Sequence, residues 1–232
     1  QEKMICNSFG ISKLKAFQKD VITDLLKGKD VLGLARTSEG KSICFLSMIT
    51  LHPNGLLIGI LPTVSLMRDL VQRCEDNKIR AGCLYSENRE NTNTIEQLTH
   101  RKLQALFVAP ERLSDPRLWK AIQKNSVHTV VVDEVHCLTE WGNEFRPMYR
   151  NIGKFIKDLP NSPVVAAFSA TVMPDDIPYI VKSLHMKNPV IHIGKLKRSN
   201  LSLKKSFVKN DAARYAKVRK AIQKYDSKGK IV

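Results

Sequence analysis

The chain has 232 residues, 43% of them hydrophobic, so it can bury the core of one large domain or of one and a half small ones. We expect neither a membrane span nor a secretory signal, because no apolar run approaches about 18 residues and the first residues contain no apolar segment. The five cysteines are scattered and form no Cys-x-x-Cys pair, which argues against a zinc site or a disulfide framework. We therefore expect a reducing, intracellular compartment, either a eukaryotic nucleus or a bacterial cytoplasm and nucleoid.

The net charge of +16 is unevenly distributed along the chain. Residues 195–232 contain 13 Lys and Arg against 2 Asp and Glu, so +11 of the charge lies in these last 38 residues. A segment of this kind suits a polyanion such as nucleic acid. A solvated helix face would carry the same charge, so charge alone leaves both interpretations open.

Apolar periodicity predicts alternating helices and strands. Leu14, Phe17 and Val21 follow helical spacing over residues 12–26, with Ser12 as the expected N-cap and Gly28 after the end. Continuous apolar runs predict strands at residues 31–34, 56–61, 81–85, 103–109, 127–132, 164–168 and 189–193. Further helices are predicted at residues 43–50, 64–72, 147–159, 174–184 and 211–225, and a polar loop at residues 86–93.

Buried strands that alternate with helices predict an α/β domain with a mostly parallel sheet and helices on both faces. In such sheets ligands bind at the carboxyl ends of the strands, which places the segments after residues 34, 132 and 168 at one edge. Residues 229–232 resemble the start of another strand, so we expect a fragment cut at a domain edge. The expected division is a nucleotide-binding domain at residues 1–194 and a basic linker with the start of a truncated second domain at residues 195–232.

Residues 35–42 (Ala-Arg-Thr-Ser-Glu-Gly-Lys-Ser) lie between a predicted strand and a predicted helix, which is the context of a phosphate-binding P-loop. Backbone N–H groups and the helix N-terminus favour a triphosphate there. We expect Lys41 to reach the β- and γ-phosphates and the Ser42 hydroxyl to hold Mg²⁺. The residues expected to bind ATP in this loop are Thr37, Ser38, Glu39, Gly40, Lys41 and Ser42.

Two carboxylates, Asp133 and Glu134, follow the apolar strand at residues 127–132. In P-loop ATPases the first acid at this place helps to hold Mg²⁺, and the second polarises the attacking water. An isolated Asp-Glu pair is usually part of a surface loop, but the P-loop upstream makes a catalytic pair the better interpretation. Together the two motifs predict ATP hydrolysis rather than phosphate binding alone.

Residues 133–136 form a DEVH box, and residues 137–149 after it resemble the aromatic-rich loop of RecQ-type DNA helicases. Residues 61–70, 107–113, 168–171 and 196–201 resemble further motifs of that family, in family order. Phe9-Gly10 followed by Lys15 and Gln18 resembles its adenine-reading motif. The resemblance covers nearly all of the chain. It implies the first RecA-like domain of an ATP-dependent, superfamily 2 helicase with 3′-to-5′ polarity, which acts with a second RecA-like domain.

The resemblance also implies roles for single residues. Gln18 should hydrogen-bond the adenine edge, Lys15 should lie against the base or sugar, Asp133 should serve Mg²⁺, and Glu134 should be the catalytic base. The residues implied to couple nucleotide state to DNA are His136, Ser169 and Thr171. The implied contacts to single-stranded DNA and to duplex–single-strand junctions are Trp141, Phe145, Arg146, Arg68 and Arg112. No membrane partner is implied.

Some of these roles have alternatives. Aromatic faces stack on unpaired bases and Arg contacts phosphate, but Phe145 suits a core position equally well, and Arg68 and Arg112 could be solvated. The P-loop departs from the family, which has Pro at Arg36 and Gly at Ser38 and Glu39. The Glu39 carboxylate would oppose an anion unless it points to solvent or pairs with Arg36. A second hypothesis is therefore a helicase-like module that binds nucleic acid without ATP turnover.

Further departures from the family lie outside the P-loop. Lys15 replaces an Arg and loses its planar stacking. Glu140 replaces a Gln, and Asn143 replaces a His. These two changes fall in the loop implied to sense DNA, so they bear on how DNA binding triggers hydrolysis.

Overall fold

The computed structural model describes residues 1–36, 39–86, 89–139, 149–194 and 205–226. The chain divides into two compact units, Gln1–Leu196 and Lys197–Val232.

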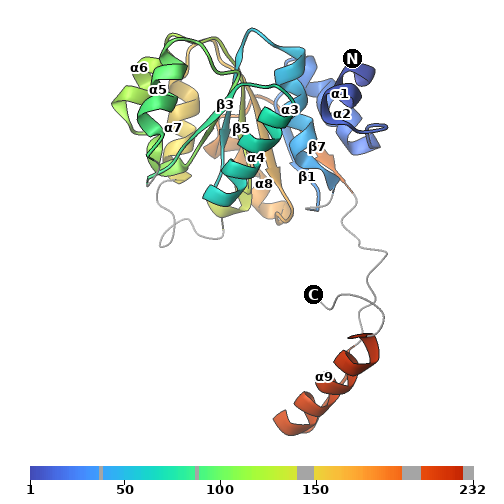
Figure 1. Cartoon of the computed structure of the whole chain (residues 1–232). Helices are drawn as coiled ribbons and strands as arrows, with labels where there is room; N and C mark the ends of the chain where they lie inside the picture. The colour runs from blue at the N-terminus through green and yellow to red at the C-terminus, as the bar shows by residue number, and fades with distance from the viewer. Residues whose placement is uncertain (37–38, 87–88, 140–148, 195–204, 227–232) are drawn as a thin grey trace. The chain divides into compact units, whose positions relative to one another are not determined.

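The first unit alternates strands and helices along the chain (Figure 1). Its strands are β1 Val31–Leu34, β2 Leu56–Ile60, β3 Ala81–Leu84, β4 Ala105–Val108, β5 Val127–Val132, β6 Val164–Ser169 and β7 Val190–Ile193. Its α-helices are α1 Glu2–Phe9, α2 Ala16–Leu26, α3 Lys41–Leu51, α4 Val64–Asp76, α5 Asn91–Thr99, α6 Pro116–Ile122, α7 Arg150–Asp158 and α8 Ile177–Ser183. Short 3₁₀ turns are η2 Pro110–Arg112, η3 Val135–Leu138 and η5 Pro174–Asp176.

The strands form one seven-stranded sheet in the order β3-β4-β2-β5-β6-β1-β7. Every pairing within it is parallel. The α/β class predicted from the sequence is therefore confirmed, and each of the seven predicted strands is present. Because parallel strands share one direction, the segments that follow β1, β5 and β6 meet at the same edge of the sheet, called the carboxyl edge below.

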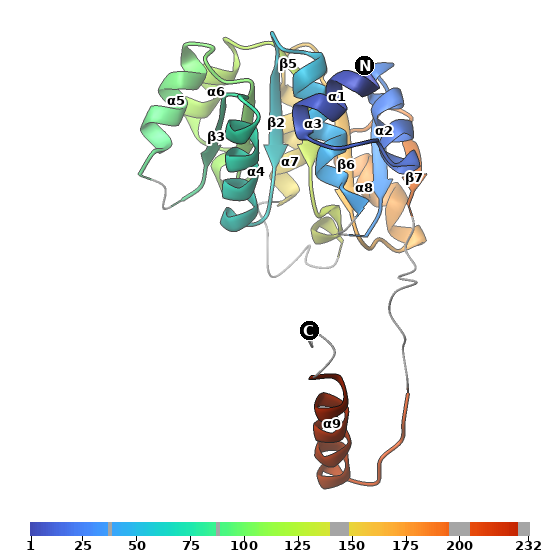
Figure 2. The same cartoon turned by 45° about the vertical axis from the view of Figure 1, so that its right-hand side comes forward.

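Helices cover both faces of the sheet, as predicted (Figure 2). One core contains buried side chains of α1 to α4, and the other contains those of α5 to α8. Alternation along β1 shows how the strands serve both cores, since Val31 belongs to the first core and Leu32 and Leu34 to the second. Burial on both faces explains why the strands between the two edge strands are nearly continuous apolar runs.

Three helices were not predicted. α1 buries only Ile5, and α5 buries only Thr94 and Leu98, so neither has a clear apolar stripe in the sequence. The loop predicted at residues 86–93 is therefore wrong from Asn91 onward, where α5 begins. α6 has seven residues, too few for the periodicity to be recognised.

The start of α2 also differs from the prediction. Its N-cap is Lys15 rather than Ser12, so the helix starts at Ala16. The Lys15 backbone N–H donates to Gln18 Oε1 at 2.9 Å, which is one half of a capping box. A side chain three residues inside the helix thus fixes its start.

Edge strand β7 pairs with β1 and with no other described strand. The Asp30 carboxylate, buried before β1, accepts hydrogen bonds from the backbone N–H groups of Val165 at 2.8 Å and Lys187 at 2.5 Å. At the other end of β7, the Gly194 N–H donates to Leu34 O at 2.8 Å. β7, the last strand of this unit, is therefore bonded at its start to Asp30, the residue before β1, and at its end to Leu34, the last residue of β1.

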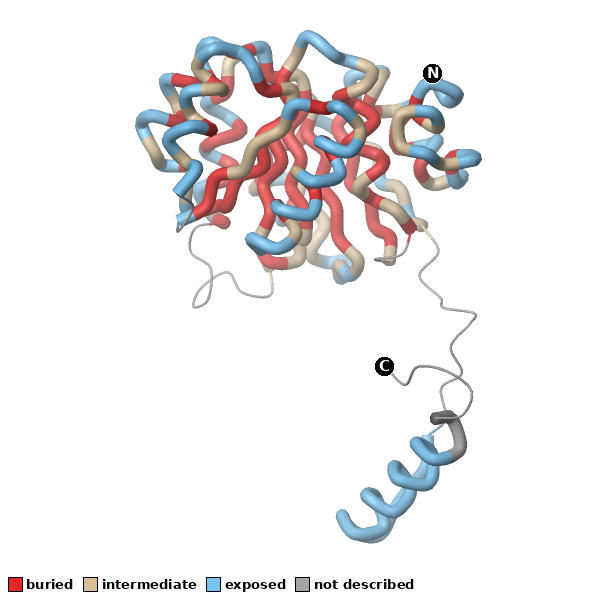
Figure 3. The backbone as a smooth tube through the Cα atoms, viewed as in Figure 1, coloured by how far each residue is buried: buried red, intermediate tan, exposed pale blue. Residues whose placement is uncertain are grey.

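The described part of the second unit contains α9, Asp211–Asp226, which confirms the basic helix predicted there. Within residues 205–223 every side chain is exposed, whereas the strands between the two edge strands of the first unit are mostly buried (Figure 3). Exposed apolar side chains on α9 are Tyr215, Val218 and Ile222. No helix in the described parts of the chain combines the length and apolarity needed to cross a bilayer.

Candidate active site

The carboxyl edge of the sheet brings together three segments that are far apart in the sequence. Ala35 directly follows β1, and its N–H donates to Ser169 O at the end of β6 at 3.0 Å. Asp133 directly follows β5, and its N–H donates to Ile60 O at the end of β2 at 3.1 Å. These backbone bonds extend the sheet by one residue, and the predicted phosphate and acid motifs begin where they stop.

The P-loop ends at the N-terminus of α3, as predicted. Gly40 is the N-cap with φ 74°, and a Cβ there would lie 2.5 Å from Gln18 Nε2, so the turn requires glycine. The next residue, Lys41, is buried, and its Nζ donates to Ala35 O at 2.9 Å. The lysine thus spans the loop and holds its two ends together.

The predicted adenine-reading residue, Gln18, lies against the P-loop and is 4% exposed. Its Nε2 donates to Glu39 O at 3.3 Å and to Gly40 O at 3.1 Å, while its Oε1 accepts the Lys15 N–H. α2 therefore positions the loop that precedes α3. This places Gln18 and Lys15 beside the candidate nucleotide site.

Glu39 is only 6% exposed, although it belongs to a loop expected to bind an anion. Its Oε1 accepts from Arg36 Nε at 2.9 Å, and its Oε2 lies 3.5 Å from Lys15 Nζ. Burial alone would raise the pKa of the Glu39 carboxyl, but the Arg36 hydrogen bond and the Lys15 charge together hold it below its usual range. Of the two arrangements that the sequence left open, the structure has the pair with Arg36.

The two residues predicted to serve Mg²⁺ are Ser42 and Asp133. Ser42 Oγ accepts from Arg73 Nη1 of α4 at 2.8 Å, a contact that nothing in the sequence indicated. Burial, together with the neighbouring Glu134 charge, raises the pKa of Asp133 to about 6. A carboxyl that is costly to ionise in this environment suits a site completed by a cation.

The chemistry of this donor set agrees with magnesium. Among the described residues no group of three or more His, Cys, Asp or Glu side chains could hold a metal. Mg²⁺ is usually bound through one or two protein oxygens together with waters and substrate phosphates. One hydroxyl and one carboxylate beside a phosphate loop therefore fit this ion.

A polar chain links the DEVH box to the segment after β6. His136 Nδ1 lies 3.1 Å from Glu134 Oε2 and 2.9 Å from Ser169 Oγ. Ser169 Oγ in turn donates to Thr171 O at 3.0 Å. Glu134 has φ 53°, a left-handed conformation that costs a non-glycine residue about 1 kcal/mol or more. The structure thus brings together all the residues predicted to couple nucleotide and DNA.

The residues predicted to contact DNA are placed only in part. Arg68 donates to the Tyr85 hydroxyl from Nη2 at 2.7 Å and lies over its ring at 5.4 Å. Arg112 Nη2 donates to Asp115 Oδ2 at 2.5 Å. Neither arginine is simply solvated, and neither partner was predicted. Thr37, Ser38, Trp141, Phe145 and Arg146 lie outside the described residues.

The model of the DEAD/DEAH box helicase family matches residues 15–177. The chain is 31% identical over 217 residues to the probable ATP-dependent DNA helicase RecS of Bacillus subtilis, covering 93% of this chain and 42% of that protein. It is also 31% identical over 231 residues to the ATP-dependent DNA helicase RecQ of a Synechocystis species, covering 97% of this chain and 48% of that protein. These relatives confirm the RecQ-type resemblance, and the chain spans less than half of their length.

Solved structures confirm the RecA-like fold. A hypothetical ATP-dependent RNA helicase from Sulfolobus tokodaii superposes with a TM-score of 0.66 at 21% identity, covering 84% of this chain and 57% of that one. The DUF1998 helicase MrfA bound to DNA and AMPPNP superposes with a TM-score of 0.69 at 14% identity, covering 96% of this chain and 34% of that one. Because the family model spans most of its length and includes the P-loop and the DEVH box, the chain belongs to the DEAD/DEAH box helicase family.

Proposed function

We propose that this chain is the first motor domain of a RecQ-type helicase, whose full length hydrolyses ATP with Mg²⁺ and separates duplex DNA with 3′-to-5′ polarity. The observation that carries the proposal is the polar chain from Glu134 through His136 to Ser169 and Thr171, beside the P-loop lysine Lys41. A site that only held phosphate would need the loop but not this link.

ATP binding would replace contacts that already exist. The Lys41 ammonium would exchange Ala35 O for the β- and γ-phosphate oxygens, which are stronger acceptors because they are charged. The N-terminus of α3 adds backbone N–H groups and a partial positive charge. Gln18 and Lys15 lie where a base could approach from α2.

Ser42 and Asp133 would hold Mg²⁺, which supplies charge neutralisation to the transferring phosphoryl group. The hydrogen bond that Arg73 Nη1 donates to Ser42 Oγ would first have to break. Asp133 would ionise fully on meeting the cation, because a positive charge favours the carboxylate.

Glu134 is the proposed general base. It would accept a proton from the attacking water, and the contact to His136 Nδ1 would hold the carboxylate in place. If DNA binding shifts the segment containing Ser169 and Thr171, the hydrogen bond between Ser169 and His136 would shift His136 as well. His136 contacts Glu134, so the position of the base would change with DNA binding.

The proposed partners are single-stranded DNA, its junctions with duplex, and a second RecA-like domain of the same protein that begins in residues 195–232. Helicase motors of this class take an arginine from that second domain, and losing such a group costs about 10³- to 10⁵-fold in turnover. We therefore expect residues 1–232 alone to be a weak ATPase.

The test is DNA-stimulated ATPase of the full-length protein, comparing wild type with Glu134→Gln. Single-stranded DNA should stimulate the wild type, and the variant should fall about 10²- to 10⁴-fold while still binding DNA. Equal, background rates for both proteins would contradict the proposal.

Glu39 supports a second candidate, a nucleic-acid-binding module without turnover, because its buried carboxylate occupies the P-loop together with two cations. Thermal unfolding with and without Mg²⁺-ATP separates the two. Ligand at 100 times its Kd stabilises by about 2.7 kcal/mol. An unchanged Tm at millimolar ATP would favour the module.

A further inference from the structure

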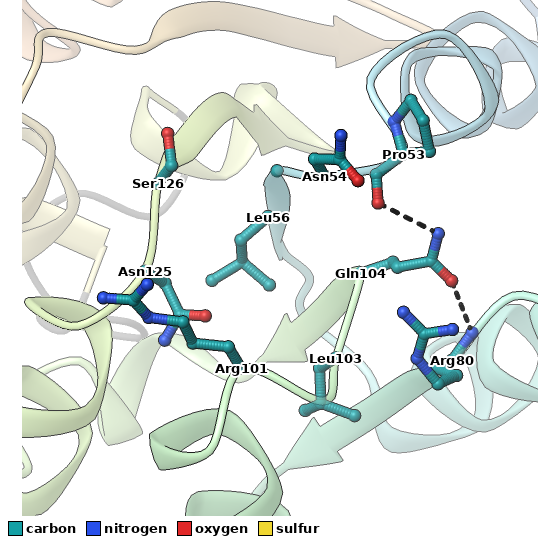
Figure 4. A pocket seen from close by; sticks show the side chains of 10 residues that line it. Pro53, Asn54, Leu56, Arg80, Arg101, Leu103, Gln104, Asn125 and Ser126 are labelled. Atoms are coloured by element: carbon teal, nitrogen blue, oxygen red, sulfur yellow. Dashed lines mark hydrogen bonds between the residues drawn. The ribbon is translucent and has the colours of Figure 1, made fainter.

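A cavity of about 220 Å³ lies at the amino edge of the sheet, where the strands begin (Figure 4). Gly55, Arg80, Gln104 and Ser126, which line it, directly precede β2, β3, β4 and β5. The P-loop follows β1 at the carboxyl edge, so the two sites lie at opposite ends of the strands. The cavity is therefore separate from the candidate active site.

The charged side chains of the cavity are all positive. Arg80 and Arg101 stand on opposite sides of it in Figure 4, with the buried Leu56 and Leu103 between them. None of the described residues that line it is acidic. The Arg101 guanidinium makes no hydrogen bond or ion pair to any residue that the structure describes, and Arg80 uses only Nε, which donates to Lys102 O at 2.7 Å.

Helices end near this edge, and their carbonyl groups could in principle account for the cations. Two of these helix carbonyls and one loop carbonyl already have side-chain donors. Asn125 Nδ2 donates to Leu98 O and to Ala121 O, both at 2.8 Å. Gln104 Nε2 donates to Pro53 O at 3.3 Å. Both arginines are exposed, and their terminal nitrogens make no hydrogen bond to the residues that the structure describes, so they stay available for a ligand.

Hydrogen bonds connect the segments that line the cavity. Gln104 bridges two loops, since it also accepts the Arg80 N–H at 3.2 Å (Figure 4). Asn125 is buried and ties the ends of α5 and α6 together. The backbone N–H of Arg80 is thus bonded to Gln104, and that of Arg101 to Leu98 O.

Arg101 also holds a conformation that arginine disfavours. It follows the end of α5 with φ 57°, a left-handed position usually occupied by glycine. Its N–H donates to Leu98 O at 3.1 Å, as in a regular helix end, so glycine would meet the backbone requirement without strain. The side chain is therefore not needed for folding at this position.

We propose that this cavity binds a phosphate group between Arg80 and Arg101. Each guanidinium group suits phosphate oxygens, which it can contact in a bidentate manner from its own side of the cavity. The cavity is smaller than the roughly 300–1,000 Å³ of clefts that hold larger organic ligands, so it suits a compact ion. The phosphate comes either from a small free anion or from the backbone of a nucleic-acid strand. This site does not depend on the proposed helicase activity.

The test is calorimetric titration of the intact protein with sodium pyrophosphate, in a Lys41→Ala background that disables the P-loop. A second arm uses a short single-stranded oligonucleotide. The informative variant is Arg101→Gly, which removes the guanidinium and relieves the left-handed backbone. The matched control is Lys102→Gln, which removes one exposed positive charge next to it without lining the cavity.

Arg101→Gly should weaken phosphate binding about tenfold, the loss expected when charge-assisted hydrogen bonds are removed, and Lys102→Gln should change it less than twofold. A loss in the pyrophosphate arm identifies a free anion as the source, and a loss confined to the oligonucleotide arm identifies a strand. The proposal is overturned if neither ligand distinguishes Arg101→Gly from Lys102→Gln. Equal or higher Tm of Arg101→Gly would show that the variant is folded.

Discussion

At the carboxyl edge of the sheet the cations predicted to meet a ligand are held by other groups of the chain, whereas at the amino edge Arg80 is held only through Nε and Arg101 is not held by any described residue. Lys41 is bonded to Ala35 O, Lys15 is paired with Glu39, and Arg112 with Asp115. Arg101 has no such partner among the described residues. Binding at the carboxyl edge must therefore exchange contacts, which allows a ligand to change the protein, while binding at the amino edge only adds them.

The largest expected effect is a loss of ATP turnover when only the carboxyl edge is altered. Lys41→Ala in the full-length protein should lower kcat/KM for ATP about 10²- to 10³-fold, because a charge that stabilises the transferring phosphate is lost. Lys27→Ala, which removes an exposed lysine after α2, is the control. DNA-stimulated ATPase measures both. A loss below tenfold would mean that Lys41 serves mainly the fold of the loop through Ala35.

The next largest effect is a loss of stability when the amino edge is altered. Asn125→Ala removes two buried hydrogen bonds, from Asn125 Nδ2 to Leu98 O and to Ala121 O, which should cost about 1–3 kcal/mol of unfolding free energy. Asn54→Ala changes an exposed residue of the same cavity and should cost less than about 0.5 kcal/mol. Urea unfolding compares them. Equal costs would show that Asn125 does not hold the cavity wall.

A smaller effect concerns pH at the amino end of β5. Burial, with the nearby His52, lowers the pKa of His128 to about 4 from an unfolded value near 6.5. Because the folded state resists protonation, this stability is complete above pH 6.5 and is lost as the pH falls from 6.5 toward 4. By pH 5 the loss should be about 1–2 kcal/mol.

The same acidification acts oppositely at the carboxyl edge. Asp133 has a raised pKa of about 6, so the folded state gains relative stability as the pH falls from 6 toward 3.8. The contribution of His128 is therefore measured as a difference, by urea unfolding of wild type and His128→Gln at pH 7.5 and pH 5. His100→Gln, at an exposed position, is the control and should keep the wild-type pH dependence.

The smallest expected effect is a change in ATP affinity, produced by removing a paired charge at the carboxyl edge. Glu39→Gln keeps the shape of the side chain but removes a carboxylate from the triphosphate site, so ATP should bind about threefold to tenfold more tightly. Glu111→Gln removes an exposed carboxylate elsewhere at the carboxyl edge and should leave the Kd unchanged. Fluorescent-nucleotide titration measures both. Weaker binding by Glu39→Gln would mean that Arg36 and Lys15 need Glu39 to support the loop.

The sequence was most informative where one physical requirement dominates. Strands buried on both faces must be nearly continuously apolar, which predicts the five inner strands, and the P-loop and the DEVH box meet at one edge because parallel strands share a direction. Helices α1 and α5 were missed since each buries one or two residues, and no stripe marks them.

Contacts between distant side chains could not be predicted in the same way. That Arg73 would reach Ser42, or that Tyr85 would hold Arg68, depends on how α4 packs, which periodicity does not encode. The pair of Glu39 with Arg36 is an exception, because only three positions separate the two residues and the sequence already allows it. The amino-edge cavity has no sequence motif, because its residues come from segments before four different strands that are far apart in the chain.

One consequence of edge strand β7 is mechanical. The residue after it, Gly194, is bonded to Leu34 and packs so tightly that a Cβ would lie 2.8 Å from the Cβ of Ala35. Ala35 is the carbonyl partner of Lys41. Gly194 therefore packs directly against the first residue of the phosphate loop, so a shift of Gly194 and a change at the Lys41 contact would act on the same residue, Ala35.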